Sequence, residues 1–316
     1  MNTNRKLTFA TANLFNFIEP PGAYYDFENI YEAEDWKGKC HWTKEQFRIL
    51  DADIIGVQEV FSIDAAKQLF SELGYPYFAC VDEPHIEDEY IYSRPVVALA
   101  SRYPIALAQS VTLDREIEQL YQTSVPDFSR KPIYARIGVP DIGDIAVYVC
   151  HLKSQRAAES VDESREEQVI GKWLSSQQRG WETVMLRLFM EQQYASHPVP
   201  TVLMGDMNQS LTSDITGLLT KEFTQNETVL SLRDSWGIYN KRYPDLARVP
   251  THYHFAKGNV LDYILVSQEF QADSSCSLAD LVDYRVLDPH LINPIFERDK
   301  QASDHAFVAL TVEFIL

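Results

Sequence analysis

Short apolar runs rich in β-branched and aromatic residues recur along the whole chain, separated by polar and turn-forming segments. Their length and composition favour β-strands. We expect strands at 7–12, 54–57, 96–100, 133–139, 145–149, 199–204, 261–266 and 307–314. The runs at 133–139 and 145–149 are joined by Pro-Asp-Ile-Gly-Asp, which is typical of a hairpin, so the sheets are expected to be mixed rather than purely parallel.

Apolar residues at helical spacing predict helices over 42–50, 63–73 and 162–196. Ser62 is a good N-cap for the second helix, and Gly74 suits the position after its C-cap. The third helix has an acidic start, which suits the helix dipole. Its apolar stripe is expected to pack on a sheet and comprises Ile170, Trp173, Leu174, Trp181, Met185, Leu188 and Phe189. Because no repeat, linker or change of composition marks a boundary, we expect one α/β (α+β) sandwich domain, 1–316.

The composition of the 316 residues is that of a globular protein, with 45% hydrophobic and 23% charged residues. These values exclude disorder, collagen and disulfide-scaffold folds. No stretch approaches the ~20 apolar residues of a membrane-spanning helix, so no stable membrane association is expected. The run at 7–12 is too short for the core of a signal peptide. The widely spaced Cys40, Cys80, Cys150 and Cys276 indicate reduced thiols. We therefore expect a cytoplasmic protein, and a monomer.

The chain is strongly acidic: 28 basic minus 46 acidic residues gives a net charge of −18. A field of this sign repels phosphate backbones at long range, which argues against a charge-driven nucleic-acid coat protein. It does not exclude an enzyme that acts on a phosphate substrate, because bound divalent cations can reverse the sign locally.

Polar side chains that bind metals or transfer protons stand at the ends of the expected strands. They are Asn13, Gln58-Glu59, His151, Asp206-Met207-Asn208, Asp262 and Ser303-Asp304-His305. Each alone has an ordinary explanation, since Asp and Asn are common turn formers at strand ends. Together they combine carboxylates, amides and imidazoles, a set that suits hydrolysis of a phosphoester.

A hard cation such as Mg²⁺ prefers carboxylate oxygens, which Glu59 and either Asp206 or Asp304 can supply. The cation neutralises the charge that develops on the phosphoryl oxygens. A carboxylate must also orient the attacking water, for which Asp206 with its neighbour Asn208 is suited. His305 paired with Asp262 can stabilise the transition state or move a proton, with the carboxylate fixing the tautomer.

At these residues the sequence resembles the endonuclease/exonuclease/phosphatase superfamily, the DNase I-like metal phosphoesterases. The resemblance covers nearly the whole chain, in order, through Thr11-Ala12-Asn13-Leu14, Gly56-Val57-Gln58-Glu59-Val60, Ala100-Ser101-Arg102-Tyr103-Pro104-Ile105, Val149-Cys150-His151-Leu152-Lys153-Ser154, Met204-Gly205-Asp206-Met207-Asn208, Leu261-Asp262-Tyr263-Ile264-Leu265 and Ser303-Asp304-His305. It implies a four-layered α/β sandwich, in which two mixed β-sheets pack face to face with helices outside.

The resemblance also implies metal-binding roles, with Mg²⁺ or Mn²⁺ as the cofactor. Glu59 would be the principal metal ligand. Asn13 would lie beside the metal and the phosphate. Asp304 would bind metal or support the site.

For the remaining matched residues the resemblance implies roles in the reaction. Asp206, helped by Asn208, would orient the nucleophilic water. His305, held by Asp262, would contact the scissile phosphate and transfer protons. His151 would stabilise the phosphate or serve as general acid.

Phe128-Ser129-Arg130-Lys131-Pro132 is similar to a Phe-Ser-Arg-x-Pro element of pancreatic-type deoxyribonucleases, in which the arginine reaches the substrate phosphates. Arg130 is suited to bidentate phosphate contact, although a surface arginine before a strand is the alternative. Basic residues expected near the site are Arg94, Arg102, Lys153 and Arg156.

The sequence departs from the family pattern in two places. Phe15 stands where abasic-site nucleases carry an acidic residue. The glutamate that partners the residue matching His151 in pancreatic-type enzymes has no clear counterpart, with Glu87, Asp88 and Glu89 as candidates. The aromatic segment 16–39 could stack bases or pack over the sandwich, and His252 and His254 are expected to be loop residues.

These observations favour a divalent-metal-dependent phosphodiesterase, foremost a DNase I-like nuclease acting on nucleic acid. A phosphatase or phosphodiesterase for a small or lipid-linked phosphate is the alternative, which the net charge of −18 makes attractive. A decayed, non-enzymatic relative should have lost some of these residues, and Glu59, Asp206, Asn208, Asp262 and His305 are all present.

Overall fold

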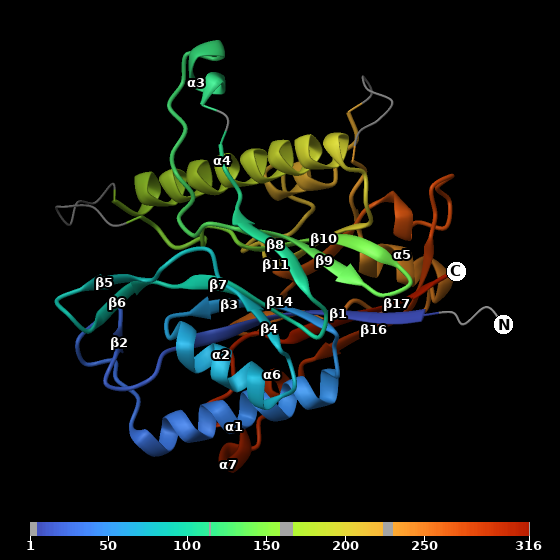
Figure 1. Cartoon of the computed structure of the whole chain (residues 1–316). Helices are drawn as coiled ribbons and strands as arrows, with labels where there is room; N and C mark the ends of the chain where they lie inside the picture. Colours follow the sequence, from blue (N-terminus) through green and yellow to red (C-terminus); the bar gives the residue numbers. More distant parts are fainter. Residues whose placement is uncertain (1–4, 114, 159–166, 224–229, 316) are drawn as a thin grey trace.

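Two six-stranded mixed sheets form the centre of the computed structural model, which describes residues 5–113, 115–158, 167–223 and 230–315 (Figure 1). The strand order of the first sheet is β16 (Ala279–Leu287), β17 (Phe307–Phe314), β1 (Arg5–Phe17), β3 (Ile54–Val60), β7 (Val96–Ser101) and β4 (Tyr77–Ala79). That of the second is β12 (Arg233–Asp234), β15 (Asp262–Val266), β11 (Thr201–Asp206), β10 (Gly143–His151), β9 (Ile133–Val139) and β8 (Ile105–Ser110). β1 is parallel to β3 and β10 is parallel to β11, while their other neighbours are antiparallel.

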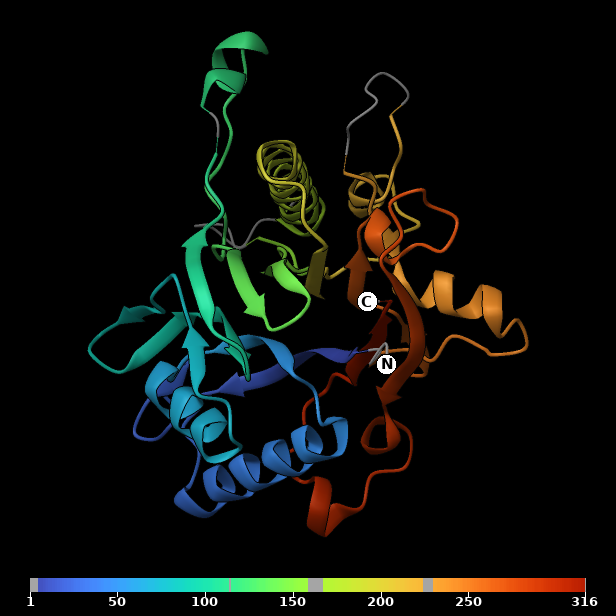
Figure 2. The same ribbon diagram turned by 45° about the vertical axis from the view of Figure 1, so that its right-hand side comes forward.

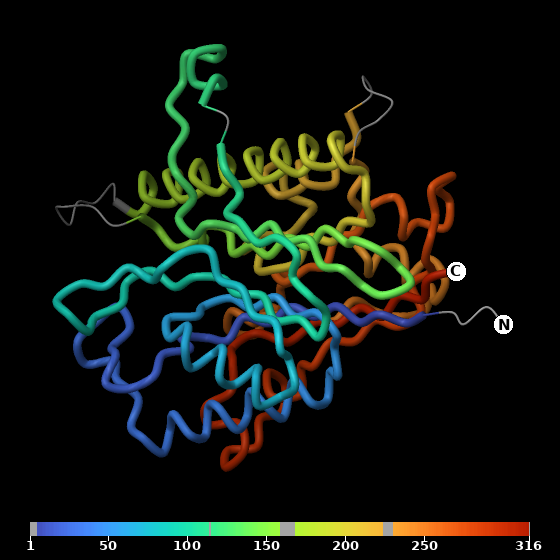
Figure 3. Tube along the Cα trace, in the orientation of Figure 1, coloured from blue at the N-terminus to red at the C-terminus, as the bar shows by residue number. Residues whose placement is uncertain are grey.

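The two sheets pack face to face through the apolar side chains of their inner faces. Phe9 and Leu310 from the first sheet and Val147, Val202 and Ile264 from the second belong to one buried cluster. Alternation along each strand sends the neighbouring residues to the outer faces, where helices cover them. The strands at the two ends of the chain, β1 and β17, lie side by side in the first sheet (Figure 3).

Helices on the outer faces complete four layers. Trp42 and Phe47 of α1 (Ala33–Leu50) and Phe70 of α2 (Ile63–Glu72) pack on the first sheet. Leu186 and Met190 of α4 (Glu167–Ser196) pack on the second. In Figure 2, α4 is seen nearly end-on above one sheet, with α1 below the other. The expected four-layered α/β sandwich is therefore confirmed.

Smaller elements decorate this core. β2 (Ala23–Tyr24), β6 (Ile91–Arg94) and β5 (His85–Glu87) form a three-stranded sheet, and β13 (His252–His254) pairs with β14 (Lys257–Asn259). The remaining helices are α3 (Glu116–Leu120), α5 (Ser235–Arg242), α6 (Pro289–Ile292) and α7 (Phe296–Asp299), with 3₁₀ turns η1 (Thr216–Leu219) and η2 (Gln268–Phe270). No helix among the described residues combines the length and the apolar character needed to cross a membrane.

Each of the eight expected strands is present, and the expected hairpin is the antiparallel pair β9–β10. The first helix, however, begins at Ala33 rather than at 42, so it takes in part of the aromatic segment 16–39. That segment packs on itself and on the sandwich: the rings of Phe17 and Trp36 lie 4.7 Å apart, and those of Tyr24 and Tyr31 5.6 Å apart.

The helix ends follow the expected signals only in part. Gly74 has a φ of 86°, which suits the residue after a C-cap. Ser62 occupies the N-cap position, but its hydroxyl accepts a hydrogen bond from the Glu19 N–H instead of capping α2. Of the expected acidic start at Asp162, Glu163, Glu166 and Glu167, only Glu167 belongs to the described residues, as the first residue of α4.

The expectation of one continuous apolar stripe on α4 is wrong for its first half and for Leu188. Met185 and Phe189 are buried, whereas Ile170, Trp173, Leu174 and Leu188 are exposed. In that half the sheet-facing positions are polar, Ser175, Arg179 and Glu182 among them. The reason is local: these polar side chains bind loops of the candidate active site, as described below.

Candidate active site

The register of the second sheet places three of the predicted residues in one row. His151 at the end of β10 lies opposite Asp206 at the end of β11, which in turn lies opposite Asp262 at the start of β15. Directly opposed residues in neighbouring strands project from the same face. Accordingly, His151 Nε2 lies 3.4 Å from Asp206 Oδ2, and all three side chains are buried.

The first sheet contributes Asn13 and Glu59 from the parallel pair β1–β3. Asn13 Nδ2 donates to Glu59 Oε1 and to Asp206 Oδ2, at 3.2 Å in both cases, and so joins the two sheets. The Asn16 N–H donates to Glu59 Oε2 at 2.9 Å. The register shifts here, and Phe15, Asn16 and Glu59 all have positive φ, so the strand ends turn to aim the Glu59 carboxylate at Asn13.

His305 completes the cluster from the segment before β17. Its Nδ1 lies 2.8 Å from Asp262 Oδ2, and its Nε2 lies 3.9 Å from Asp206 Oδ2 and 4.0 Å from Asp304 Oδ1. The Ser303 hydroxyl fixes the segment by donating to the Asn13 carbonyl at 2.7 Å. The predicted pair of His305 and Asp262 is therefore formed between the two sheets.

The Gly205-Asp206-Met207-Asn208 element requires glycine at its first position because the backbone of the adjacent strand lies close to it. Gly205 has a φ of 151°, and a Cβ there would lie 1.9 Å from the Cys150 carbonyl oxygen on the adjacent strand. Asn208 then caps the element: its N–H donates to Asp206 Oδ1 at 2.7 Å, and its Nδ2 donates to the Leu152 carbonyl at 2.9 Å. Asn208 thus orients the Asp206 carboxylate and ties it to the loop after His151.

Burial and neighbouring charges set opposite protonation preferences on the two histidines. Burial alone would lower the pKa of His305, but the charges of Asp262 and Asp206 outweigh it and raise that pKa well above its ordinary value. For His151, burial is reinforced by the positive charges of Arg130 and His305, which lowers its pKa well below the ordinary value. Burial also raises the pKa of the Asp206 carboxyl, an effect opposed by His305. At neutral pH the site therefore contains a protonated His305 and a neutral His151.

Several buried polar atoms of this cluster have no hydrogen-bond partner among the described residues. They are His151 Nδ1, Asp262 Oδ1, Asp304 Oδ1, His252 Nδ1 and two guanidinium nitrogens of Arg130, Nε and Nη1. Buried polar atoms are normally paired, so a group of orphans in one place indicates a bound ligand. Ligand atoms of Asp206, Asp262 and His305 lie within 4.8 Å of one another, as do those of His252, Asp304 and His305. Together with Glu59, the carboxylates of these two groups fit a divalent cation, whereas a protonated His305 has no lone pair to offer one.

Arg130 lies beside this cluster. Its charge acts on His151, and it acts on the Tyr25 hydroxyl both through its charge and as a hydrogen-bond partner. The residue before it is fixed by Glu182 of α4, whose Oε1 accepts from the Ser129 N–H at 2.8 Å and from the Ser129 hydroxyl at 2.6 Å. The other oxygen of Glu182 accepts from the Lys153 N–H at 2.6 Å.

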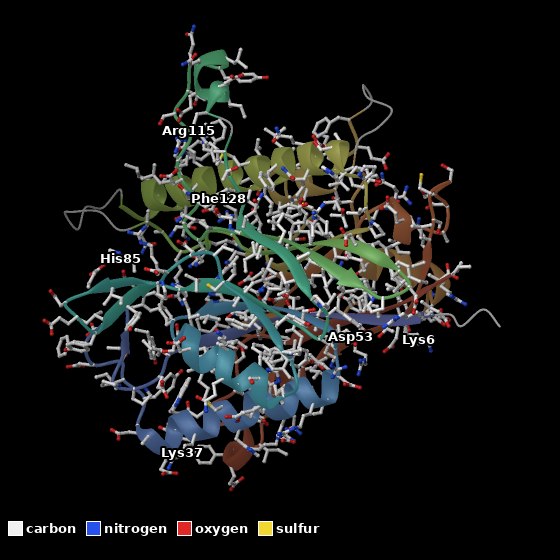
Figure 4. The ribbon with its side chains drawn as sticks, in the orientation of Figure 1. Lys6, Lys37, Asp53, His85, Arg115 and Phe128 are labelled. Atoms are coloured by element: carbon white, nitrogen blue, oxygen red, sulfur yellow. The ribbon has the colours of Figure 1, made fainter. Side chains whose placement is uncertain are left out.

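Three expectations about the surroundings are wrong. None of Glu87, Asp88 and Glu89 partners His151: all three are exposed, and Glu87 lies 3.6 Å from His85. Arg102 is not near the site, because it pairs with Asp53 just before β3, at the opposite end of the strand from Glu59. Figure 4 shows Asp53 well to the right of His85 and Phe128.

His252 is the third correction, since it lies in β13 rather than in a loop. Its ring centroid is 4.9 Å from that of His305, and its Nε2 lies 4.0 Å from Asp304 Oδ2. A strand of three residues is too short to show an alternating pattern, so this placement could not be predicted from the sequence. His254, in the same strand, is exposed.

The comparisons with known proteins agree with this geometry. The profile of the Endonuclease/Exonuclease/phosphatase family matches residues 40–305. None of the curated proteins compared with the sequence matches it.

Solved structures give the same fold at low identity. The catalytic domain of human Nocturnin with bound sulfate superposes with a TM-score of 0.63 at 16% identity, covering 99% of this chain and 96% of that chain. ANGEL2, a 2′,3′-cyclic phosphatase, superposes with a TM-score of 0.59 at 14% identity, covering 99% of this chain and 96% of that chain. TDP2 of D. rerio, complexed with a single-strand DNA product, superposes with a TM-score of 0.58 at 12% identity, covering 97% of this chain and 98% of that chain. With most of its length matched by the family profile, the chain belongs to the endonuclease/exonuclease/phosphatase family of phosphoester hydrolases.

Proposed function

We propose that the protein is a divalent-metal-dependent phosphodiesterase that acts as a nuclease. The observation that carries this proposal is the Asn13 amide, which contacts Glu59 on one side and Asp206 on the other. The amide therefore links Glu59, a carboxylate suited to binding a metal, to Asp206, a carboxylate suited to orienting a water molecule. The His305–Asp262 pair lies against the same Asp206 oxygen.

Glu59, Asn13 and Asp304 would hold Mg²⁺ or Mn²⁺, which supplies charge neutralisation at the phosphoryl oxygens when it is bound. Asp206 would orient the attacking water and accept its proton. Its raised pKa makes it a stronger base than an exposed carboxylate. The N–H of Asn208 holds one oxygen of Asp206, while the other oxygen, which already accepts from Asn13 Nδ2, would bind the water through its second lone pair.

The two histidines would act on the phosphate. His305, kept protonated by Asp262 and Asp206, would donate a charged hydrogen bond to a phosphoryl oxygen. His151, with a lowered pKa, would remain neutral and donate a hydrogen bond without adding charge. Arg130 would bind a phosphate through Nε and Nη1, which have no hydrogen-bond partner among the described residues.

A nucleic-acid substrate is supported by the basic groups that gather here despite the acidic chain. The charges of Arg130 and Arg156 both act on Tyr25, and Arg156 also acts on His252. TDP2, one of the structural relatives, is complexed with a single-strand DNA product. The alternative is a small or lipid-linked phosphoester, favoured by the net charge of −18, which repels a polyanion at long range.

Nicking of supercoiled plasmid DNA in Mg²⁺ or Mn²⁺ tests the proposal. Cleavage should require the metal, stop in EDTA and be lost in His305→Ala. The matched control is His197→Ala, since His197 is exposed beyond the end of α4. Cleavage that survives EDTA or His305→Ala contradicts the proposal. Turnover of a small phosphodiester without plasmid cleavage would favour the alternative substrate.

A further inference from the structure

Lys39 is a buried cation in the wall of the candidate active site. It lies on α1, below the first sheet in Figure 1, and its side chain is 1% exposed. The ammonium faces two aromatic rings, with Nζ 5.6 Å from the centroid of Phe15 and 5.5 Å from that of Tyr31. Neighbouring Lys37, by contrast, is exposed and pairs with Glu34 at 2.7 Å; Figure 4 shows it on the outer side of α1.

The charges that act on Lys39 are those of Glu59 and Asp304. Geometry places this aromatic wall beside Glu59: the ring of Phe15 faces Lys39, and the N–H of the next residue, Asn16, donates to Glu59 Oε2 at 2.9 Å. No direct hydrogen bond or ion pair joins the ammonium to another residue in the described part of the chain. Its counter-charges therefore lie across a gap rather than in contact.

A buried ammonium without contact partners is costly, so the fold must compensate for it. Burial lowers the pKa of Lys39 to about 8, and the two carboxylates oppose this effect. The faces of Phe15 and Tyr31 add cation–π attraction.

We propose that Lys39 is a buried cation of the metal site, which shares Glu59 and Asp304 with the divalent ion and lowers the affinity of that ion. The inference rests on the proposed function, because it takes Glu59 and Asp304 as metal ligands. The physical reason is charge balance: a fixed positive charge facing the same carboxylates repels an incoming cation. Before the ion binds, the Lys39 ammonium acts as the counter-charge of these two carboxylates.

Titration of the protein with Mn²⁺ alone, followed by calorimetry, tests this without any turnover. Lys39→Met keeps the length and apolar stem of the side chain and removes its charge. Its dissociation constant for Mn²⁺ should fall by about tenfold or more, because a unit charge within the same site acts strongly on a divalent ion. Lys39→Arg keeps the charge and should remain close to the wild type. Lys37→Met removes a charge from the same helix at an exposed position and should leave the constant unchanged.

The outcomes separate the inference from the proposed function. A wild-type protein that binds no Mn²⁺ overturns both. Mn²⁺ binding by the wild type with an unchanged or weaker constant in Lys39→Met overturns only the role of Lys39. If Lys39→Met does not fold, Lys39→Gln removes the same charge with a polar side chain and is judged by the same criterion.

Discussion

The carboxylate of Glu182 accepts two hydrogen bonds from Ser129, one from the backbone N–H at 2.8 Å and one from the hydroxyl at 2.6 Å. Ser129 precedes Arg130, the candidate phosphate-binding residue. The second oxygen of Glu182 binds the Lys153 N–H, two residues after His151. One buried side chain on α4 therefore sets the position of two loops that border the active site.

Glu182→Gln should weaken this positioning. An amide NH₂ would face one of the backbone donors that now bind a carboxylate oxygen, leaving it unpaired at a cost of about 1–3 kcal/mol. We expect kcat/KM for a phosphodiester to fall by about 10- to 100-fold through displacement of the loops. Glu191→Gln is the control, because Glu191 lies on the same helix and pairs with Arg187 away from these loops. Equal losses in both variants would show that Glu182 serves the stability of α4 only.

The pairing of Asp262 with His305 predicts a shift in pH dependence. Asp262 raises the pKa of His305 by its charge and by a hydrogen bond. Asp262→Asn removes both effects, so His305 should lose its proton at lower pH. The alkaline limb of the kcat/KM profile should move toward acid, and the maximal rate should fall by about 10²–10⁴-fold. A reduced rate with an unmoved limb would show that a group other than His305 titrates there.

Arg130 should matter more for a polymer than for a small substrate. Two of its guanidinium nitrogens are buried and have no hydrogen-bond partner in the described part of the chain, as expected of donors whose acceptor is a bound phosphate. Arg130→Ala should lower DNA cleavage by about 10- to 100-fold, the range for a hydrogen bond to a charged group. Cleavage of a small phosphodiester should be spared.

Arg242→Ala is the matched control for Arg130→Ala, because it changes the net charge equally at an exposed position on α5. It should leave both reactions unchanged. Equal loss of both reactions in Arg130→Ala would contradict a role in contacting DNA.

The apolar patterns of the sequence predicted the sandwich because its central strands are buried and alternate between two apolar faces. Edge strands carry a weaker signal: β16 is half-buried along most of its length and was not predicted. In the site, the polar residues that interrupt the apolar runs of the sequence include Asn13, Glu59 and Asp206, and the structure brings these three side chains together.

Charged residues on helices could not be assigned in the same way. Lys39 and Glu182 belong to helices that also carry many exposed charged residues, and a helical pattern does not distinguish an inward charge from an outward one. Glu182 is buried because loops far away in the sequence supply its hydrogen-bond partners, and Lys39 is buried because the rings of Phe15 and Tyr31 cover its ammonium. Buried charged residues of this kind can be recognised only from the three-dimensional structure.

Asp299 connects the C-terminal part of the chain to α1 and should make stability depend on pH. Its carboxylate accepts from Trp42 Nε1 at 3.0 Å, from the Ile295 N–H at 2.8 Å and from Arg298 at 2.8 Å. The Arg298 hydrogen bond, with those from Ile295 and Trp42, lowers the pKa of Asp299 to about 2. A carboxyl whose pKa is lower in the folded than in the unfolded protein stabilises the fold at pH values above its unfolded-state pKa. This stabilisation is lost as the pH falls through its folded-state pKa.

Asp299→Asn should therefore lower the free energy of unfolding by about 1–3 kcal/mol at neutral pH. The difference from the wild type should shrink as the pH falls from 3.8 toward about 2, which urea unfolding across this range measures. Asp245→Asn removes an exposed carboxylate and should leave stability nearly unchanged. If the deficit of Asp299→Asn instead grew on acidification, the charged hydrogen bonds of Asp299 would not be its cause, since protonation of the wild-type carboxyl can only bring the two proteins closer together.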